Sequence, residues 1–252
     1  MSDRGYDGHN QQGGDWGPGV HAGAAARATA ADAQIDARLG FIRRTYAHLA
    51  GAIALFVVLT TVLVNSPVAE LMVNLMTASS MSWLVVLALF IGSGWVADWW
   101  AHNMESTPLQ YLGLALGVVS YSIVFIPMLF IAAHYSSPEV IPNAAITTLA
   151  VFSVLTGFVF VTKRDFSMLR TGLVVFSALA FGAIIAGMLF GFTLGLGFSI
   201  IMVGLAAGYV VYYTSNVLHH YRTDQHVAAA LALFSAIALM FWYILRIFMS
   251  RN

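Results

Sequence analysis

VAAALALFSAIALMFWYILRIF, residues 227–248, is the stretch that decides the fold, because it carries one charge over a length that can cross a lipid bilayer. A transmembrane helix needs about 20 mainly apolar residues to span the hydrocarbon core. Comparable apolar stretches occur at residues 46–64, 82–100, 109–133, 143–161, 168–190 and 194–217. The alternation typical of a β-barrel is absent, and a helix satisfies its own backbone hydrogen bonds in lipid. The sequence therefore predicts an all-α polytopic membrane protein with seven transmembrane helices.

The composition agrees with this class and excludes several functions. Of the 252 residues, 60% are hydrophobic and 9% are charged, whereas a soluble domain has about 25% charged residues. The absence of cysteine excludes disulfides and thiolate metal sites. The net charge of zero argues against nucleic acid as a partner, because no basic patch collects phosphates.

Residues 1–40 differ in composition from the rest of the chain. Their first half is rich in Gly, Asp and Gln, their second half is rich in Ala, and they lack the apolar core of a cleaved export signal. We expect a disordered cytoplasmic tail, with a short helix at Ile35–Ile42 on the membrane surface. Residues 41–252 then form the seven-helix transmembrane domain.

The positions of Lys and Arg predict the orientation. Most of them precede the first span or lie in or beside the loops after the fourth and sixth spans: Arg4, Arg27, Arg38, Arg43, Arg44, Lys163, Arg164, Arg170 and Arg222. The positive-inside rule places these segments, and the N-terminus, in the cytoplasm. Seven spans then place the C-terminus outside, although Arg246 and Arg251 lie there. A seventh segment that only re-enters the membrane would remove this conflict, and the sequence leaves both alternatives open.

Small residues and a proline indicate how the helices pack. Gly187 and Gly191 are four positions apart, as are Gly204 and Gly208, which is a spacing that lets helix backbones approach each other. Pro127 lies inside the third span, where it removes a backbone hydrogen bond. We expect it to kink or break that helix.

Ionisable residues within spans are scarce and therefore informative. Asp98 stands among Trp95, Trp99 and Trp100, so it is either an interfacial carboxylate facing water or one that points into a cytoplasmic vestibule. His48 lies one turn into the first span, where it can bond a neighbouring helix or titrate near neutral pH. Spans three to seven hold no deep Asp or Glu.

The end of the sixth span is unusually polar. His219, His220 and His226 lie there or just beyond it, and His220 and Asp224 are four positions apart. Two such ligands on one helix face are a weak metal signal, so the pattern predicts capping of terminal carbonyls more strongly than a metal site. The chain holds no GxSxG, HExxH or glycine-rich phosphate loop. We therefore expect no enzyme, no cofactor and no bound metal.

Four segments together resemble a known family. They are RRTYAHLAG (residues 43–51), FIP (125–127), TKRDFSML (162–169) and YTSNVLHHYRTDQHV (213–227). Over residues 41–250 the chain resembles the bacterial branch of the Bax inhibitor-1 family, the transmembrane Bax inhibitor motif-containing proteins. The most specific motifs are the loop of Thr162, Lys163, Arg164, Asp165, Phe166 and Ser167, and the Thr-Ser-Asn-x-x-His helix end. Asp165 and Ser167 can also cap the fifth span.

The resemblance implies six helices around a central seventh and a calcium leak that depends on pH. In such family members, two carboxylates from the last two helices share a proton and close the pore. Here Tyr213 occupies the first of these positions, and the second falls near Ser235 or Ala236. Neither position holds an acid, so the usual sensor pair is absent. The candidate pore and gate region comprises Tyr213, Thr214, Ser215, Asn216, His219, Asp224, Ser235, Asp98 and Pro127.

Two functions follow as expectations. The first is a pH-influenced calcium or cation leak in the bacterial inner membrane, with the lipid bilayer and calcium ion as partners. The alternative is a non-transporting regulator of a membrane-bound AAA protease or another quality-control partner, contacted through the tail of residues 1–40. The sequence leaves open the ion selectivity, the partner, the oligomeric state and whether a histidine replaces the missing carboxylates.

Overall fold

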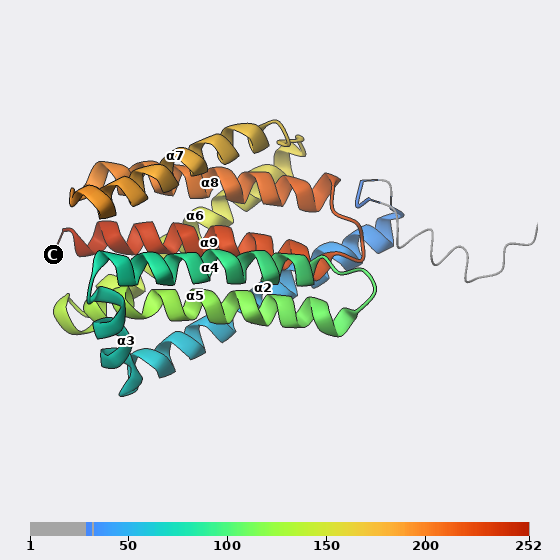
Figure 1. The fold of residues 1–252 in the computed structure, drawn as a ribbon. Coiled ribbons are helices and arrows are strands. Elements are labelled where there is room, and N and C mark those ends of the chain that lie inside the picture. Colours follow the sequence, from blue (N-terminus) through green and yellow to red (C-terminus); the bar gives the residue numbers. More distant parts are fainter. Residues whose placement is uncertain (1–28, 32, 252) are drawn as a thin grey trace, which may run out of the picture.

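A computed structural model describes residues 29–31 and 33–251, and seven long apolar helices account for most of them (Figure 1). These helices are α2 (Ile35–Val64), α4 (Ser80–Ala101), α5 (Thr107–Tyr135), α6 (Val140–Thr162), α7 (Leu169–Phe190), α8 (Leu196–His219) and α9 (His226–Met249). The shorter α3 (Val68–Thr77) connects α2 to α4. The described residues contain no strand, only an isolated bridge between Thr29 and Arg222. The predicted all-α class and the seven spans are confirmed.

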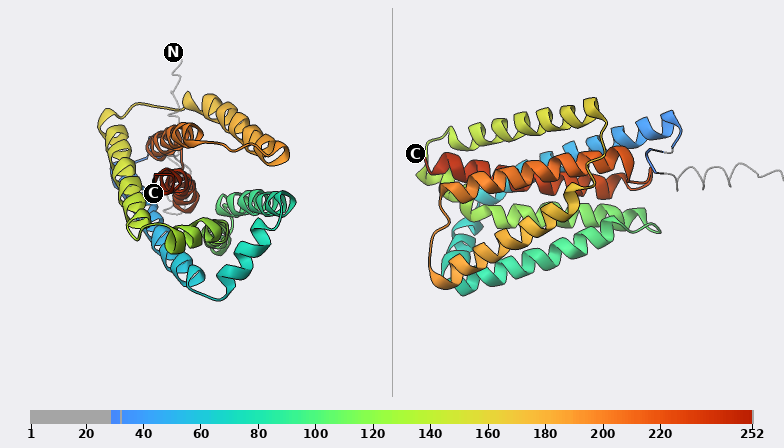
Figure 2. Two further views of the ribbon diagram at one scale, coloured as in Figure 1. Left: turned by 90° about the vertical axis from the view of Figure 1, so that its left-hand side faces the viewer. Right: turned by 90° about the horizontal axis from the view of Figure 1, so that it is seen from above.

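Helix α9 forms the core of the bundle, as the family resemblance implies. It contacts α2, α4, α5, α6 and α8, and Figure 2 shows it enclosed when the bundle is viewed along its length. About 72% of the residues in an apolar 18-residue stretch of α9 are buried, because apolar residues surround the helix on all sides. Helix α7 packs mainly against α8 and, more weakly, α4, so it lies at the periphery.

Helix α2 begins at Ile35, well before the expected start of the first span at residue 46. The predicted surface helix is therefore the first part of α2. This segment is held in place because the Arg38 guanidinium donates to the Leu218 carbonyl at 3.3 Å and Ala30 N–H donates to the Tyr221 carbonyl at 2.9 Å. Residues 1–28 of the predicted tail lie outside the described residues.

Helix α3 stands where we expected a loop at residues 65–81. The Asn65 backbone N–H and side-chain amide both bond the Thr61 carbonyl and terminate α2, and Pro67 precedes the new helix. Its 10 residues are too few to span a membrane, so the lengths of the apolar stretches do not predict it.

We expected a kink or a break at Pro127; a break is absent, because α5 runs without interruption from Thr107 to Tyr135. Pro127 is buried, and its neighbours Phe125 and Ile126 are almost fully buried as well. Transmembrane helices tolerate an internal proline where neighbouring helices support the freed backbone groups.

The two ends of the bundle differ in charge. We name the basic end for Arg38, Arg43, Arg44, Lys163, Arg164, Arg170 and Arg222, which lie at the start of α2, at the α6–α7 connection and between α8 and α9. Arg246 and Arg251 lie at the opposite end, with the C-terminus (Figure 1). Helix α9 has 24 residues and runs the full length of the bundle, so it spans rather than re-enters. Its two ends are therefore at opposite ends of the molecule.

Candidate functional site

The two most specific sequence motifs meet at the basic end through Ser215. The Ser215 hydroxyl accepts a hydrogen bond from the Phe166 N–H at 2.9 Å and donates to the Arg164 carbonyl at 3.4 Å. Its side chain is fully buried. The loop after α6 can reach α8 because Lys163 adopts a left-handed conformation (φ 50°) and turns the chain out of α6.

Asp165 links the same loop to His220, the residue that follows the end of α8. The His220 ring donates from Nε2 to the Asp165 carboxylate, 3.0 Å from Oδ2, and Ser167 N–H donates to Oδ1 at 2.9 Å. Burial acts to raise the pKa of Asp165, but these hydrogen bonds from Ser167 and His220 outweigh it and hold the pKa below its ordinary value. The prediction that Asp165 and Ser167 cap α7 is wrong: Met168 is the N-cap, and Asp165 instead stabilises the turn before the helix.

The polar residues that flank Ser215 bond backbone or lie among other hydroxyls. The Asn216 carbonyl accepts from the N–H groups of His220 and Tyr221, both at 2.8 Å, and His219 Nδ1 donates to the Ser215 carbonyl at 3.0 Å. The buried Thr214 hydroxyl lies beside that of Tyr46 on α2. Asn216 and His219 therefore stabilise the end of α8 itself, and Thr214 lies next to α2.

Tyr213 belongs to a group of aromatic hydroxyls that we call the tyrosine cluster, made of Tyr121, Tyr209, Tyr212, Tyr213 and Tyr221. The Tyr213 ring centroid lies 5.6 Å from that of Tyr209 and 5.2 Å from that of Tyr212. Tyr121 and Tyr221 also lie within electrostatic range of Tyr213, and the Tyr121 hydroxyl contacts that of Ser235. Tyr121 therefore lies near both candidate gate positions, Tyr213 and Ser235.

The cluster connects to the basic end through Tyr221. Burial raises the pKa of the Tyr221 hydroxyl, and the nearby Asp98 carboxylate raises it further. The His102 ring stacks near Tyr221, with centroids 6.5 Å apart, and lies 3.3 Å from Asp98 Oδ1. The hydrogen bond to Asp98 raises the pKa of His102. Asp98 itself is largely exposed, which agrees with the reading of an interfacial carboxylate facing water.

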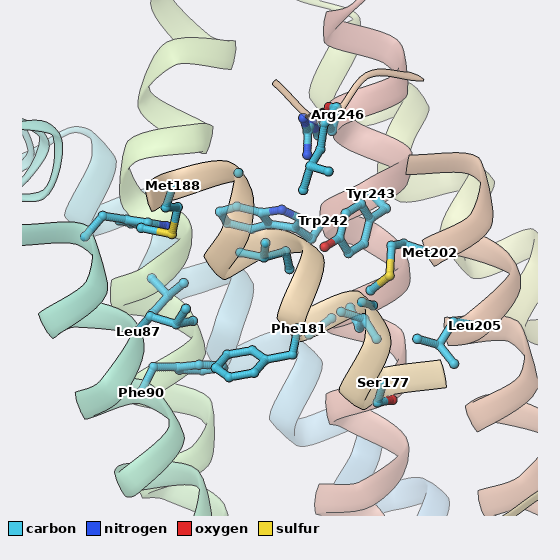
Figure 3. Close-up of a pocket in the computed structure, with 18 of the residues that line it drawn as sticks. Leu87, Phe90, Ser177, Phe181, Met188, Met202, Leu205, Trp242, Tyr243 and Arg246 are labelled. Carbon is cyan, nitrogen blue, oxygen red and sulfur yellow. Dashed lines mark hydrogen bonds between the residues drawn. The ribbon is translucent and has the colours of Figure 1, made fainter. Parts of the chain in front are cut away.

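Towards the opposite end, the cluster reaches a cavity of about 550 Å³. The Tyr209 hydroxyl is 2.8 Å from Ser177 Oγ, and Ser177 lines this cavity. Figure 3 shows Ser177 at one end and Arg246 at the other. The remaining lining is mainly apolar, from α4, α5, α7, α8 and α9: Trp83, Leu87, Phe90, Tyr121, Phe181, Ile184, Met188, Met202, Leu205, Leu239, Trp242 and Tyr243. From the sequence, Arg246 was apparent only as a charge at the C-terminal side of the last span.

Two other candidates lie apart from the cluster. Asp224 bonds the Arg222 guanidinium at 2.9 Å through Oδ2. His48 donates from Nδ1 to the Arg44 carbonyl and accepts from the Tyr111 hydroxyl at 2.9 Å, so it joins α2 to α5. The part of the chain that the structure describes contains no group of three or more His, Cys, Asp or Glu side chains that could hold a metal ion.

Comparisons with known proteins agree with these motifs. The family model described as "Inhibitor of apoptosis-promoting Bax1" matches residues 38–252. The chain is 28% identical to "BI1-like protein" of Arabidopsis thaliana, over 83% of this chain and 80% of the relative. It is 29% identical to "Protein LIFEGUARD 4" of Arabidopsis thaliana, over 84% and 85%. An uncharacterised protein of Neisseria meningitidis is 26% identical over 71% and 79%. No solved structure gives a significant match.

Proposed function

Since the chain belongs to the Bax inhibitor-1 family, we propose that it is a slow cation leak, permeable to calcium, which the tyrosine cluster closes in the present conformation. The family membership and the seven spans make it a multi-pass membrane protein. The basic end is proposed to face the cytoplasm of a bacterial inner membrane, following the positive-inside rule.

One observation carries this proposal, namely a series of polar side chains that leads from the basic end of the bundle to the cavity. Asp98 at the basic end lies within electrostatic range of Tyr221, and Tyr221 lies within electrostatic range of Tyr213. From there Tyr209 leads to Ser177 and the cavity. Burying polar side chains at membrane depth costs free energy, so a series of them on neighbouring helices favours a pathway over plain packing.

The closed state follows from the chemistry of the tyrosines. A tyrosine hydroxyl has a reference pKa of about 10, so Tyr213 stays neutral at physiological pH and offers a calcium ion no anionic oxygen. The Arg246 guanidinium in the cavity also opposes cation entry from its end. We therefore expect a slow leak rather than fast conduction.

The test is calcium entry into liposomes that contain a calcium-sensitive dye, followed between about pH 6 and pH 8, the range in which histidine titrates. We expect the native chain to give a small flux above empty vesicles. Tyr213→Asp should increase it at least about tenfold, because a carboxylate restores an oxygen ligand at the closure. The control is Tyr135→Asp, which changes an exposed tyrosine at the end of α5 in the same way. Flux at the empty-vesicle level in folded native protein and in folded Tyr213→Asp contradicts the proposal.

A second candidate function is regulation of a membrane-bound AAA protease without transport. It is favoured by the docking of the chain's N-terminal side onto the α8–α9 connection, where Thr29 bridges Arg222 and Arg38 bonds the Leu218 carbonyl. A partner that engages residues 1–28 would thereby be connected to the central helix. Deletion of these residues should abolish co-purification with such a protease. If the deletion leaves co-purification unchanged, this function is wrong in the proposed form.

A further inference from the structure

The cavity beside Arg246 has the dimensions of a ligand site. Its volume of about 550 Å³ lies within the range of roughly 300–1,000 Å³ that small-molecule sites occupy. Figure 3 shows Leu87 of α4, Phe181 of α7, Met202 of α8 and Trp242 of α9 around it. Such walls favour an apolar occupant.

The cavity carries one formal charge among its described lining residues, and that charge is positive. Arg246 lies in the last turn of α9, and its guanidinium donates to the Leu194 carbonyl. Within residues 29–31 and 33–251, no carboxylate lies at ion-pair distance from it. A guanidinium has five N–H donors in a planar fork that matches a carboxylate. The cavity therefore complements a molecule with an anionic head and an apolar body.

The depth of the cavity corresponds to one leaflet of a bilayer. On α7 it extends from Ser177 to Met188, which is a rise of roughly 16 Å at about 1.5 Å per residue. That distance is about half of a hydrocarbon core of about 30 Å. Arg246 stands at the end of a spanning helix, where the head groups of lipids lie, and Ser177 stands at the deep end (Figure 3).

The cavity is also next to lipid. The helices that flank it, α4 and α7, are the least buried of the seven, and they touch each other only weakly (Figure 2). An amphiphile in the surrounding leaflet can therefore reach the cavity from the side.

We propose that this cavity binds a long-chain fatty acid, with its carboxylate on Arg246 and its chain running past Trp242 and Phe181 towards Ser177. The carboxylate fits because it is planar and accepts two parallel hydrogen bonds from a guanidinium. This binding does not require that the protein conduct ions, and its test measures no flux.

The test is photolabelling of the full chain in zwitterionic phosphatidylcholine nanodiscs with a fatty acid that carries a diazirine at the chain terminus. Mapping of the labelled peptides should find the label on the lining segments of α7 and α9. Oleate should compete with the label at least about tenfold better than oleyl alcohol, which has the same chain without the charge. Label spread evenly over the lipid-facing helices, or equal competition by the two compounds, would overturn the proposal.

Three variants make the assignment specific. Arg246→Gln should remove the advantage of oleate over oleyl alcohol. Arg251→Gln, which changes an exposed arginine at the same end, should keep it. Ala180→Phe should abolish labelling by filling the cavity while the protein remains monodisperse. If nanodiscs that contain phosphatidylglycerol suppress the labelling as strongly as oleate does, the occupant is a phospholipid and the fatty-acid proposal is wrong.

Discussion

At the scale of single residues, the buried Ser215 hydroxyl joins two segments that are distant along the chain. It accepts from Phe166 N–H and donates to the Arg164 carbonyl, and so holds the α6–α7 loop against α8. A serine side chain can fill both roles because a hydroxyl is at once donor and acceptor. Alanine at this position would leave the Phe166 N–H without its partner.

We predict that Ser215→Ala lowers the free energy of unfolding by about 1–3 kcal/mol, which is the range for an unsatisfied buried donor. The measurement is denaturant unfolding of the purified protein in micelles. Ser153→Ala is the matched control, since the Ser153 hydroxyl is exposed and bonds only the Leu149 carbonyl of its own helix. A loss no larger than that of the control would contradict the role of Ser215.

Asp165 and His220 yield a prediction about pH. The folded-state pKa of Asp165 is depressed, so its contribution to stability is present above the unfolded-state pKa and is lost as the pH falls through the folded-state pKa. His220→Gln should raise the pKa of Asp165 and reduce the loss of stability on acidification. NMR titration of the labelled carboxyl group measures the first effect. An unchanged Asp165 pKa in the variant would show that Ser167 N–H alone sets the value.

At the scale of helices, α4 and α5 approach each other closely at Gly113. A Cβ atom there would lie 2.6 Å from both Ala101 N and Ala97 O, which are backbone atoms and cannot give way. The paired glycines of the sequence contribute differently. Gly208 faces Leu173 of α7, whereas Gly204 has open space around it and Gly191 ends α7 with a positive φ of 75°.

We predict that Gly113→Ala separates α4 from α5 and destabilises the protein by about 1–3 kcal/mol, the usual effect of overpacking. Gly92→Ala on α4 is the control, because nothing lies within 4 Å of its added Cβ. The control should be neutral or slightly stabilising, since alanine favours helix more than glycine does. The measurement compares the unfolding transitions of the two variants. Equal stability of Gly113→Ala and Gly92→Ala would show that the close packing of α4 on α5 does not require a glycine at position 113.

At the scale of the whole molecule, seven spans place the α6–α7 loop and the α5–α6 connection on opposite faces of the membrane. The chain has no cysteine, so single-cysteine variants report on topology without further changes. Ser137→Cys in the α5–α6 connection should react with a membrane-impermeant maleimide in intact cells. Ser167→Cys in the α6–α7 loop should react only after permeabilisation. The reverse pattern would place the basic end outside.

The sequence by itself determined the class, the number of spans and the positions of the motifs. Each span is a local property, because about 20 consecutive apolar residues suffice to cross a bilayer as a helix. The resemblance carried by residues 162–169 and 213–227 also indicated that the last helix is central. The helix α3 escaped prediction because its 10 residues fall short of that length.

Only the tertiary structure decided which of these residues meet. It brought Ser215 to Phe166, Tyr213 and Ser235 to the same Tyr121, and Arg246 to the cavity between α4 and α7. Pro127 was expected to kink or break α5, and the helix continues through it, because packing against the neighbouring helices outweighs one lost hydrogen bond. The physical reason is common to all of these cases: contacts between helices depend on their relative rotation and depth, and an apolar helix carries little in its own sequence that specifies either.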